Sequence, residues 1–192
     1  MHIDPAITLS QRRYIERILI ADAYRMECLH ALRALNLPQG YIGAGFLRNA
    51  IWDAQHGYRA RTPLNDVDVI YFDAHDQSVA SECAIKDALQ QQCPTVPWQV
   101  KNQARMHTQH NHAPYTSCED AISMWIERET CVAVRMSKDD AFEFLAPFGL
   151  SQNMAGTISV NPKISRPEVF HRRVATKKWL KQWPQLRLVS AQ

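Results

Sequence analysis

The stretch Tyr41–Asp73, YIGAGFLRNAIWDAQHGYRARTPLNDVDVIYFD, decides how the rest of the chain is interpreted. Its beginning, Tyr41–Gly45, joins a short apolar lead to two glycines, which allow backbone conformations that a Cβ would forbid. The following residues predict a helix from Phe46 to about His56. The run Asp66–Phe72 is rich in β-branched and aromatic residues and predicts a strand. The stretch therefore predicts a compact unit of strand, glycine turn, helix, loop and strand.

Two acidic residues alternate at the start of the second strand. Side chains alternate across a strand, so Asp66 and Asp68 share one face, about 7 Å apart along the chain. Burying two neighbouring carboxylates without compensation costs several kcal/mol. A bound divalent cation removes that cost, and Mg²⁺ prefers a few carboxylates together with phosphate oxygens. The alternative is a solvated strand end, because the Asp-x-Asp spacing alone is not specific.

The glycine turn favours an anionic ligand. A helix that begins directly after Gly45 directs its free N–H groups at whatever lies above the turn, and helix N-termini attract phosphate for that reason. The turn is neither a Walker A loop nor a G-x-G-x-x-G motif, because the required lysine and third glycine are absent. A purely structural tight turn remains the alternative for the glycines by themselves. Arg48, in the first turn of the helix, could reach a phosphate with its forked donors or form a surface salt bridge.

Taken together, these features resemble the nucleotidyltransferase superfamily with the polymerase-beta-like fold, and more closely a bacterial family of nucleotidyltransferase-like proteins. The resemblance covers most of the chain from about Leu37 onward. The superfamily usually has Gly-Gly or Gly-Ser in the turn, where this chain has Gly43-Ala44-Gly45. The residues that carry the match are Gly43–Asn49 with Trp52, Asn65–Asp73, Trp98–His107 and Ala146–Leu150.

The resemblance implies an α+β fold: a mixed β-sheet with helices packed mainly on one face, plus N- and C-terminal helices. It implies a metal site for Mg²⁺ or Mn²⁺ at Asp66 and Asp68. The nucleotide site that it implies is made of Gly43, Ala44, Gly45, Arg48, Asn49, Lys101, Asn102 and Arg105. For the last three residues, spacing alone favours a solvated strand face, and only the resemblance makes them site residues.

A third catalytic carboxylate on a later strand is also implied by the resemblance. A hairpin is predicted from Thr130–Met136 and Ala141–Leu145 around a polar turn. Its second strand contains Phe142-Glu143-Phe144, so we expect Glu143 to be that carboxylate. An outward charge on an edge strand is the equal alternative, and Glu127 and Glu129 are the next candidates for the third carboxylate. The histidines at 107, 110 and 112 lie in a polar segment without a regular scaffold, which favours an exposed loop over a zinc site.

Composition limits the class of protein. The 192 residues are 46% hydrophobic and 21% charged, which suits one packed domain. No run approaches the ~20 apolar residues of a membrane span. The five cysteines are odd in number and lack a C-x-x-C pair, which favours reduced thiols and a cytoplasmic location. We expect a single nucleotidyltransferase-like domain over 1–192, with a helical segment 1–36, a core 37–150 and a basic extension 151–192.

The flanking segments are predicted to be helical. Residues from about Thr8 to Leu35 show apolar spacings of three and four, with a possible break near Ala21. A further amphipathic helix is expected over Asp76–Gln92, with an inward face made of Val79, Cys83, Ile85 (or Ala84), Ala88 and Leu89. From residue 162 to the C-terminus there are eight basic residues and one acid, in a chain whose net charge is only +3. The segment is expected to form a basic helix that could bind triphosphate or RNA. More often such a run of charges is a solvated helix face.

The function that follows is transfer of a nucleoside monophosphate from a nucleoside triphosphate to an acceptor hydroxyl, with release of pyrophosphate. The sequence leaves the acceptor open between a small molecule, a protein and RNA, and it indicates neither a membrane nor DNA as partner. Two alternatives stay open. One is a nucleotide-binding or regulatory module without turnover, and the other is an RNA-binding protein that uses the basic C-terminal helix.

Overall fold

A five-stranded mixed sheet forms the centre of the molecule. The computed structural model describes residues 7–164 and 166–189, so residues 1–6, 165 and 190–192 of the predicted domain lie outside the described part. The strand order is β3-β2-β1-β4-β5, in which β2 and β3 are parallel and the other neighbours are antiparallel. The strands are β1 Tyr41–Gly43, β2 Val67–Tyr71, β3 Trp98–Asn102, β4 Ala133–Met136 and β5 Phe142–Leu145.

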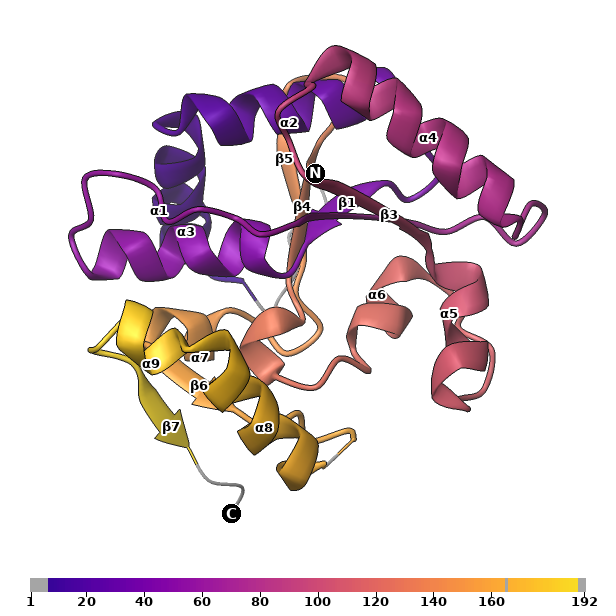
Figure 1. Cartoon of the computed structure of the whole chain (residues 1–192). Helices are drawn as coiled ribbons and strands as arrows, with labels where there is room; N and C mark the ends of the chain where they lie inside the picture. The colour runs from indigo at the N-terminus through magenta and orange to yellow at the C-terminus, as the bar shows by residue number, and fades with distance from the viewer. Residues whose placement is uncertain (1–6, 165, 190–192) are drawn as a thin grey trace.

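Helices cover the sheet unequally (Figure 1). The larger core lies on the face that carries Val69 and Ile42, where the first four helices pack. These are α1 Leu9–Ile20, α2 Ala23–Ala34, α3 Gly45–Gln55 and α4 Val79–Gln92. The other face carries Ile70 and Tyr41 and is covered in part by α6 Cys118–Ile122, next to α5 Gln103–His110. The predicted mixed sheet with helices mainly on one face is therefore confirmed.

Local sequence signals explain the N-terminal helices. Thr8 caps α1 with a capping box, in which its hydroxyl accepts from the Gln11 N–H and the Gln11 side chain accepts from the Thr8 N–H. The helix ends at Ala21, and Asp22 caps α2 through the Arg25 N–H. The expected break near Ala21 is thus present. None of the helices in the described part is long and apolar enough to cross a membrane.

The buried face of α4 differs from the predicted one. Val79 is 57% exposed and Cys83 is also exposed, whereas Glu82 is buried with Leu89. The apolar spacing did not include Glu82 among the inward residues. It faces inward because polar groups that follow β3 bind its carboxylate, as described below.

The C-terminal segment forms a second layer against α3. After the short helices η1 Arg128–Thr130 and α7 Ser151–Met154, the strands β6 Thr157–Ser159 and β7 Arg187–Val189 form a small parallel sheet. Between them lie α8 Pro167–Lys177 and α9 Trp179–Gln182. Trp179 and Trp183 pack edge-on against the fully buried Trp52 of α3, with ring centroids 5.8 and 5.1 Å away. This aromatic cluster holds the basic helix α8 beside the glycine turn.

Candidate functional site

The glycine turn ends β1 and begins α3. The register that pairs Ile42 with Val69 places Gly43 beside Asp68 of the neighbouring strand. A Cβ on Gly43 would lie 2.9 Å from Trp125 Cη2, so the ring of Trp125 requires glycine there. Ala44 has a φ of 53°, and no side chain caps the first turn of α3. The N–H groups of that first turn are therefore free for an anionic ligand.

Asp66 and Asp68 lie where this helix begins. Both half-buried side chains line a cavity of about 230 Å³ together with Ala44, Gly45 and Arg48. Within the described part of the chain, neither carboxylate accepts a hydrogen bond or forms an ion pair. Burial raises the pKa of Asp68 to about 6, and repulsion from Asp66 adds to the shift. The structure thus brings the two predicted metal ligands together at the predicted turn, with no partner from residues 7–164 and 166–189.

Arg48 is a buried cation that faces the same cavity. Only 6% of it is exposed, and its guanidinium donates to Thr130 Oγ1 (2.7 Å) and to Asn49 Oδ1 (3.0 and 3.2 Å). It lies over the rings of Trp52 and Trp179, at 4.8 and 4.4 Å from their centroids. It makes no salt bridge to a carboxylate of the described residues, and burial lowers its pKa to about 10. A desolvated guanidinium without a counter-charge is suited to an anionic ligand.

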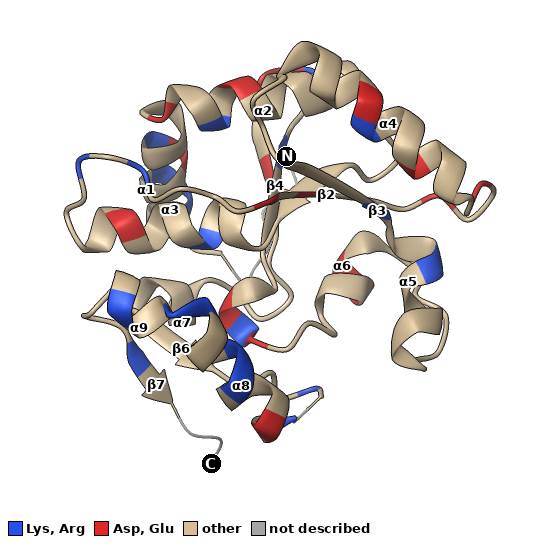
Figure 2. Ribbon diagram, in the orientation of Figure 1, with Lys and Arg blue, Asp and Glu red and all other residues tan. Residues whose placement is uncertain are grey.

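Two further cations were not assigned to the site from the sequence. Arg173 and Lys177, one turn apart on α8, also line the cavity. Figure 2 shows that lysines and arginines recur along this helix. Arg173 is held by the buried Glu127 through a hydrogen bond of 2.5 Å from its Nε to Oε1. The excess of basic residues near the C-terminus was the available signal, but it does not show which of them face the turn.

Glu143 does not join the two aspartates. It lies on β5, which is three strands from β2 in the sheet order, a separation of roughly 14 Å. Its carboxylate accepts from Arg135 Nε and Nη2 (2.8 and 2.5 Å) and lines a different cavity beside α2. An edge strand with a paired outward charge explains this position, so we do not retain Glu143 as a third metal ligand.

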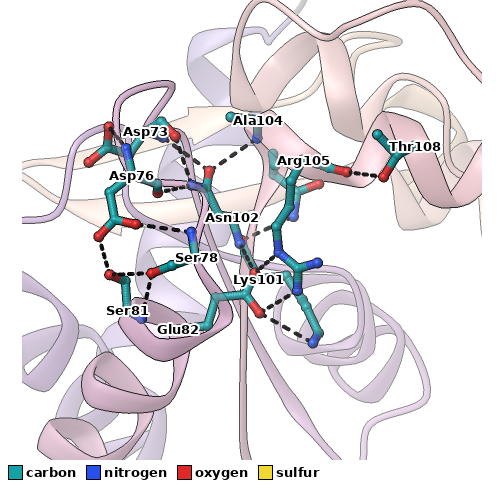
Figure 3. A network of polar contacts seen from close by, with 11 residues as sticks. Asp73, Asp76, Ser78, Ser81, Glu82, Lys101, Asn102, Ala104, Arg105 and Thr108 are labelled. Carbon is teal, nitrogen blue, oxygen red and sulfur yellow. Dashed lines mark hydrogen bonds and ion pairs between the residues drawn. The ribbon is translucent and has the colours of Figure 1, made fainter.

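Asn102 and Arg105 are turned toward α4 (Figure 3). The fully buried Asn102 donates to the carbonyls of Asp73 and Asp76 (2.7 and 2.8 Å) and caps α5. Arg105 binds both oxygens of Glu82, at 2.8 and 2.7 Å. These two residues therefore stabilise the fold at the end of β3, and neither lines the cavity of the two aspartates.

Lys101 occupies an intermediate position. Its side chain is 49% exposed and its Nζ lies 3.4 Å from Glu82 Oε2. It lines a second cavity that also contains Asp68. Of the three residues implied by the resemblance on this segment, Lys101 alone lines a cavity that contains one of the two aspartates, Asp68.

A variant of Arg105 separates a structural role from a binding role. We expect Arg105→Met to lower the free energy of unfolding by about 2–4 kcal/mol, because the buried carboxylate of Glu82 keeps only the Asn102 N–H and the half-exposed Lys101 as partners. Nucleotide affinity measured by calorimetry at 15 °C should stay at the wild-type value. The double variant Arg105→Met/Glu82→Met should recover much of the lost stability, since it removes both charges. Stability close to wild type for Arg105→Met combined with weaker nucleotide binding would return Arg105 to the site.

The histidine segment forms no metal centre in the described residues. His107 and His110 belong to α5, and His112 Nδ1 lies 2.6 Å from the hydroxyl of Tyr115. Over 7–164 and 166–189, no group of three or more His, Cys, Asp or Glu side chains could hold a metal ion. The predicted pair of aspartates therefore fits a cation only if that cation takes its other ligands from a phosphate or from water, which is the coordination that Mg²⁺ favours.

Three solved structures of known proteins have a fold similar to this chain. A solved structure described as a CCA-adding enzyme head domain has a TM-score of 0.82 and 29% sequence identity, covering 96% of this chain and 98% of that one. A CCA-adding enzyme in complex with CTP has a TM-score of 0.61 at 11% identity, covering 91% of this chain. A tRNA-processing enzyme with CTP has a TM-score of 0.52 at 14% identity, covering 84% of this chain.

The chain spans 43% of the length of each of these two longer structures. Among proteins with curated descriptions, none matches the sequence. A family profile described as nucleotidyltransferase matches residues 30–188. The chain, with its polymerase-beta-like fold, therefore belongs to this nucleotidyltransferase family.

Proposed function

We propose that the protein transfers a nucleoside monophosphate from a nucleoside triphosphate to an acceptor hydroxyl, with release of pyrophosphate, and that it depends on a divalent metal ion. The observation that carries this proposal is one cavity lined by three cations and by two carboxylates that have no partner among the described residues. The carboxylates belong to Asp66 and Asp68, and the cations to Arg48, Arg173 and Lys177. Such a pairing of charges fits a metal-bound triphosphate.

The cations and the helix start hold the leaving group in this proposal. Arg48 presents its guanidinium from a dry site, where an ionic hydrogen bond to a phosphate oxygen is stronger than in water. A Cβ on Gly45 would lie in contact with the Arg48 and Asn49 side chains, 3.5–3.7 Å from their nearest atoms. Because Gly45 has no Cβ, this side of the guanidinium stays uncovered. The free N–H groups of α3 face the same space. Negative charge that develops on pyrophosphate is therefore stabilised by fixed donors.

Asp66 and Asp68 would hold the metal, for which Mg²⁺ and Mn²⁺ are the candidates. When bound, such an ion polarises the α-phosphate and lowers the pKa of the acceptor hydroxyl. The two carboxylates also orient the reacting groups at the end of β2, next to the turn. No nucleophilic side chain is required, because positioning and electrostatics account for most of phosphoryl-transfer catalysis.

The experiment is a turnover assay. Purified protein is incubated with each labelled nucleoside triphosphate, Mg²⁺ or Mn²⁺ and a cell extract as acceptor source, and pyrophosphate release and label transfer are followed. We expect metal-dependent turnover that falls by a factor of about 1,000 or more in Asp66→Asn/Asp68→Asn, since the loss of metal-held transition-state charge is worth several kcal/mol. Turnover at the wild-type rate in the double variant would contradict the proposal.

A nucleotide-binding module without turnover is the second candidate. It is favoured by one observation, namely that no third carboxylate joins Asp66 and Asp68 among the described residues. This candidate predicts metal-dependent binding of nucleoside triphosphate with neither pyrophosphate release nor label transfer under any of the assay conditions. The same assay, combined with a binding measurement, separates the two.

A further inference from the structure

A second cavity adjoins the proposed triphosphate site. It has a volume of about 300 Å³, which lies at the lower end of the range of small-molecule pockets (roughly 300–1,000 Å³). Four residues line both cavities: Ala44, Asp68, Thr130 and Arg173. The two cavities are therefore joined at Asp68, the residue proposed to hold the metal.

Two elements show that the cavities lie end to end. Along β2, the triphosphate cavity is lined by Asp66 and Asp68, and the second cavity by Asp68 and Ile70. Each step of two residues is about 7 Å. Along α8 the order is the same, because Lys177 lines the first cavity, Arg173 both, and Arg166 at the helix start the second. Both elements thus lead from the triphosphate cavity, past the junction at Asp68, into the second cavity.

Two cavities placed end to end fit an in-line displacement at phosphorus. The attacking oxygen and the leaving oxygen lie roughly in line on opposite sides of the α-phosphorus. If pyrophosphate leaves toward Arg48 and Lys177, the attacking hydroxyl enters from the far side of Asp68. The second cavity occupies that side. We infer that this cavity binds the acceptor and not the nucleoside of the donor triphosphate, an inference that rests on the proposed function.

The lining indicates the class of acceptor. Part of the lining is apolar or aromatic, as in pockets for flat rings, and it includes Ile70, Met106, Tyr115, Met124 and Trp125 beside polar residues such as Gln103 and His112. Positive charge lies at Lys101 and Arg166, and Arg166 makes no ion pair with a described residue. The cavity therefore suits an alcohol that carries a flat ring and a negatively charged group. Its hydroxyl oxygen attacks the α-phosphorus, the bond to pyrophosphate breaks, and the hydroxyl proton is lost to solvent.

The test uses two ligands at once. The protein is first saturated with Mg²⁺ and α,β-methylene-ATP, which cannot release pyrophosphate, and AMP is then titrated into it by calorimetry. AMP has a flat ring, hydroxyl groups and one phosphate, and it meets an occupied nucleoside site if the donor lies in this cavity. We expect AMP to bind the saturated protein with 1:1 stoichiometry. Arg166→Gln should weaken AMP about tenfold and leave adenosine unchanged, because only AMP carries the charge.

Variants of the cavity wall complete the design. Met124→Trp fills the cavity and is expected to abolish AMP binding, while the affinity for α,β-methylene-ATP stays at the wild-type value. Val79→Trp, which adds the same ring on exposed surface of α4, should change neither affinity. Weaker α,β-methylene-ATP binding in Met124→Trp, or no AMP binding to the saturated wild type, would overturn the acceptor assignment alone. Failure of α,β-methylene-ATP to bind the wild type in the presence of Mg²⁺ would overturn the proposed function as well.

Discussion

Replacing Asp68 with asparagine is expected to raise the free energy of unfolding of the metal-free protein by about 2 kcal/mol near pH 8, and to leave it almost unchanged near pH 4. The reason is the pKa of Asp68, which burial and the neighbouring Asp66 raise from 3.8 to about 6. Between these two values the folded protein binds more protons than the unfolded chain. Its stability therefore falls as pH rises through this window, and asparagine removes that loss.

The measurement is urea denaturation in EDTA at a series of pH values between about 4 and 8. Asp87→Asn, a neutral change at an exposed acid of α4, is the matched control and should show no such dependence. Addition of Mg²⁺ with α,β-methylene-ATP should make the wild type more stable than Asp68→Asn. Ligands that bind only the folded state stabilise it, and Asp68→Asn cannot hold the metal. Identical pH profiles for Asp68→Asn and the wild type would contradict the described environment of this carboxylate.

Replacing Arg48 with methionine is expected to lower the affinity for the Mg²⁺-bound triphosphate by about 100-fold, because two ionic hydrogen bonds to phosphate are lost. The free energy of unfolding should fall by only about 1–2 kcal/mol, the cost of the hydrogen bonds that the guanidinium gives to Thr130 and Asn49. A buried arginine that loses a carboxylate partner is costly to replace, but this guanidinium has no carboxylate partner among the described residues and lies over the rings of Trp52 and Trp179. Methionine fits between those rings without a desolvated charge.

Calorimetric binding and thermal unfolding are measured on the same samples. Arg48→Lys serves as the control, since it keeps the charge but loses the forked donors and the planar stacking, and an intermediate affinity is expected. A large drop in stability for Arg48→Met, with unchanged triphosphate affinity, would mean that Arg48 supports the fold and not the ligand.

The local sequence pattern predicted the strand, turn and helix at the centre of the candidate site because these elements are contiguous in the chain. The strand with Asp66 and Asp68, the glycine turn and the start of α3 lie within one stretch of chain, and each depends on short-range backbone preferences. The sheet register, a contact across 25 residues that the sequence did not predict, then brings Gly43 beside Asp68. The break between α1 and α2 and the hairpin of β4 and β5 were predicted for the same reason.

Other features depend on contacts that are distant in sequence. The sequence could not show that β1 and β4 separate β2 from β5, and this separation is what moves Glu143 away from the aspartates. The face of α4 is set by Glu82 and its partner Arg105, which apolar spacing cannot detect. Arg173 and Lys177 face the turn because Phe170 and Val174 are buried beside Trp52, a packing that no local signal predicts.

In the proposed function, Asp66, Asp68 and the cations around the glycine turn bind one metal-bound triphosphate. Its most direct test is an electron paramagnetic resonance titration with Mn²⁺, in the presence and absence of α,β-methylene-ATP, for the wild type and Asp66→Asn/Asp68→Asn. We expect the wild type to bind one Mn²⁺ tightly only when the analogue is present, and the double variant not to bind it. Equal Mn²⁺ binding by both proteins in the presence of the analogue would contradict it.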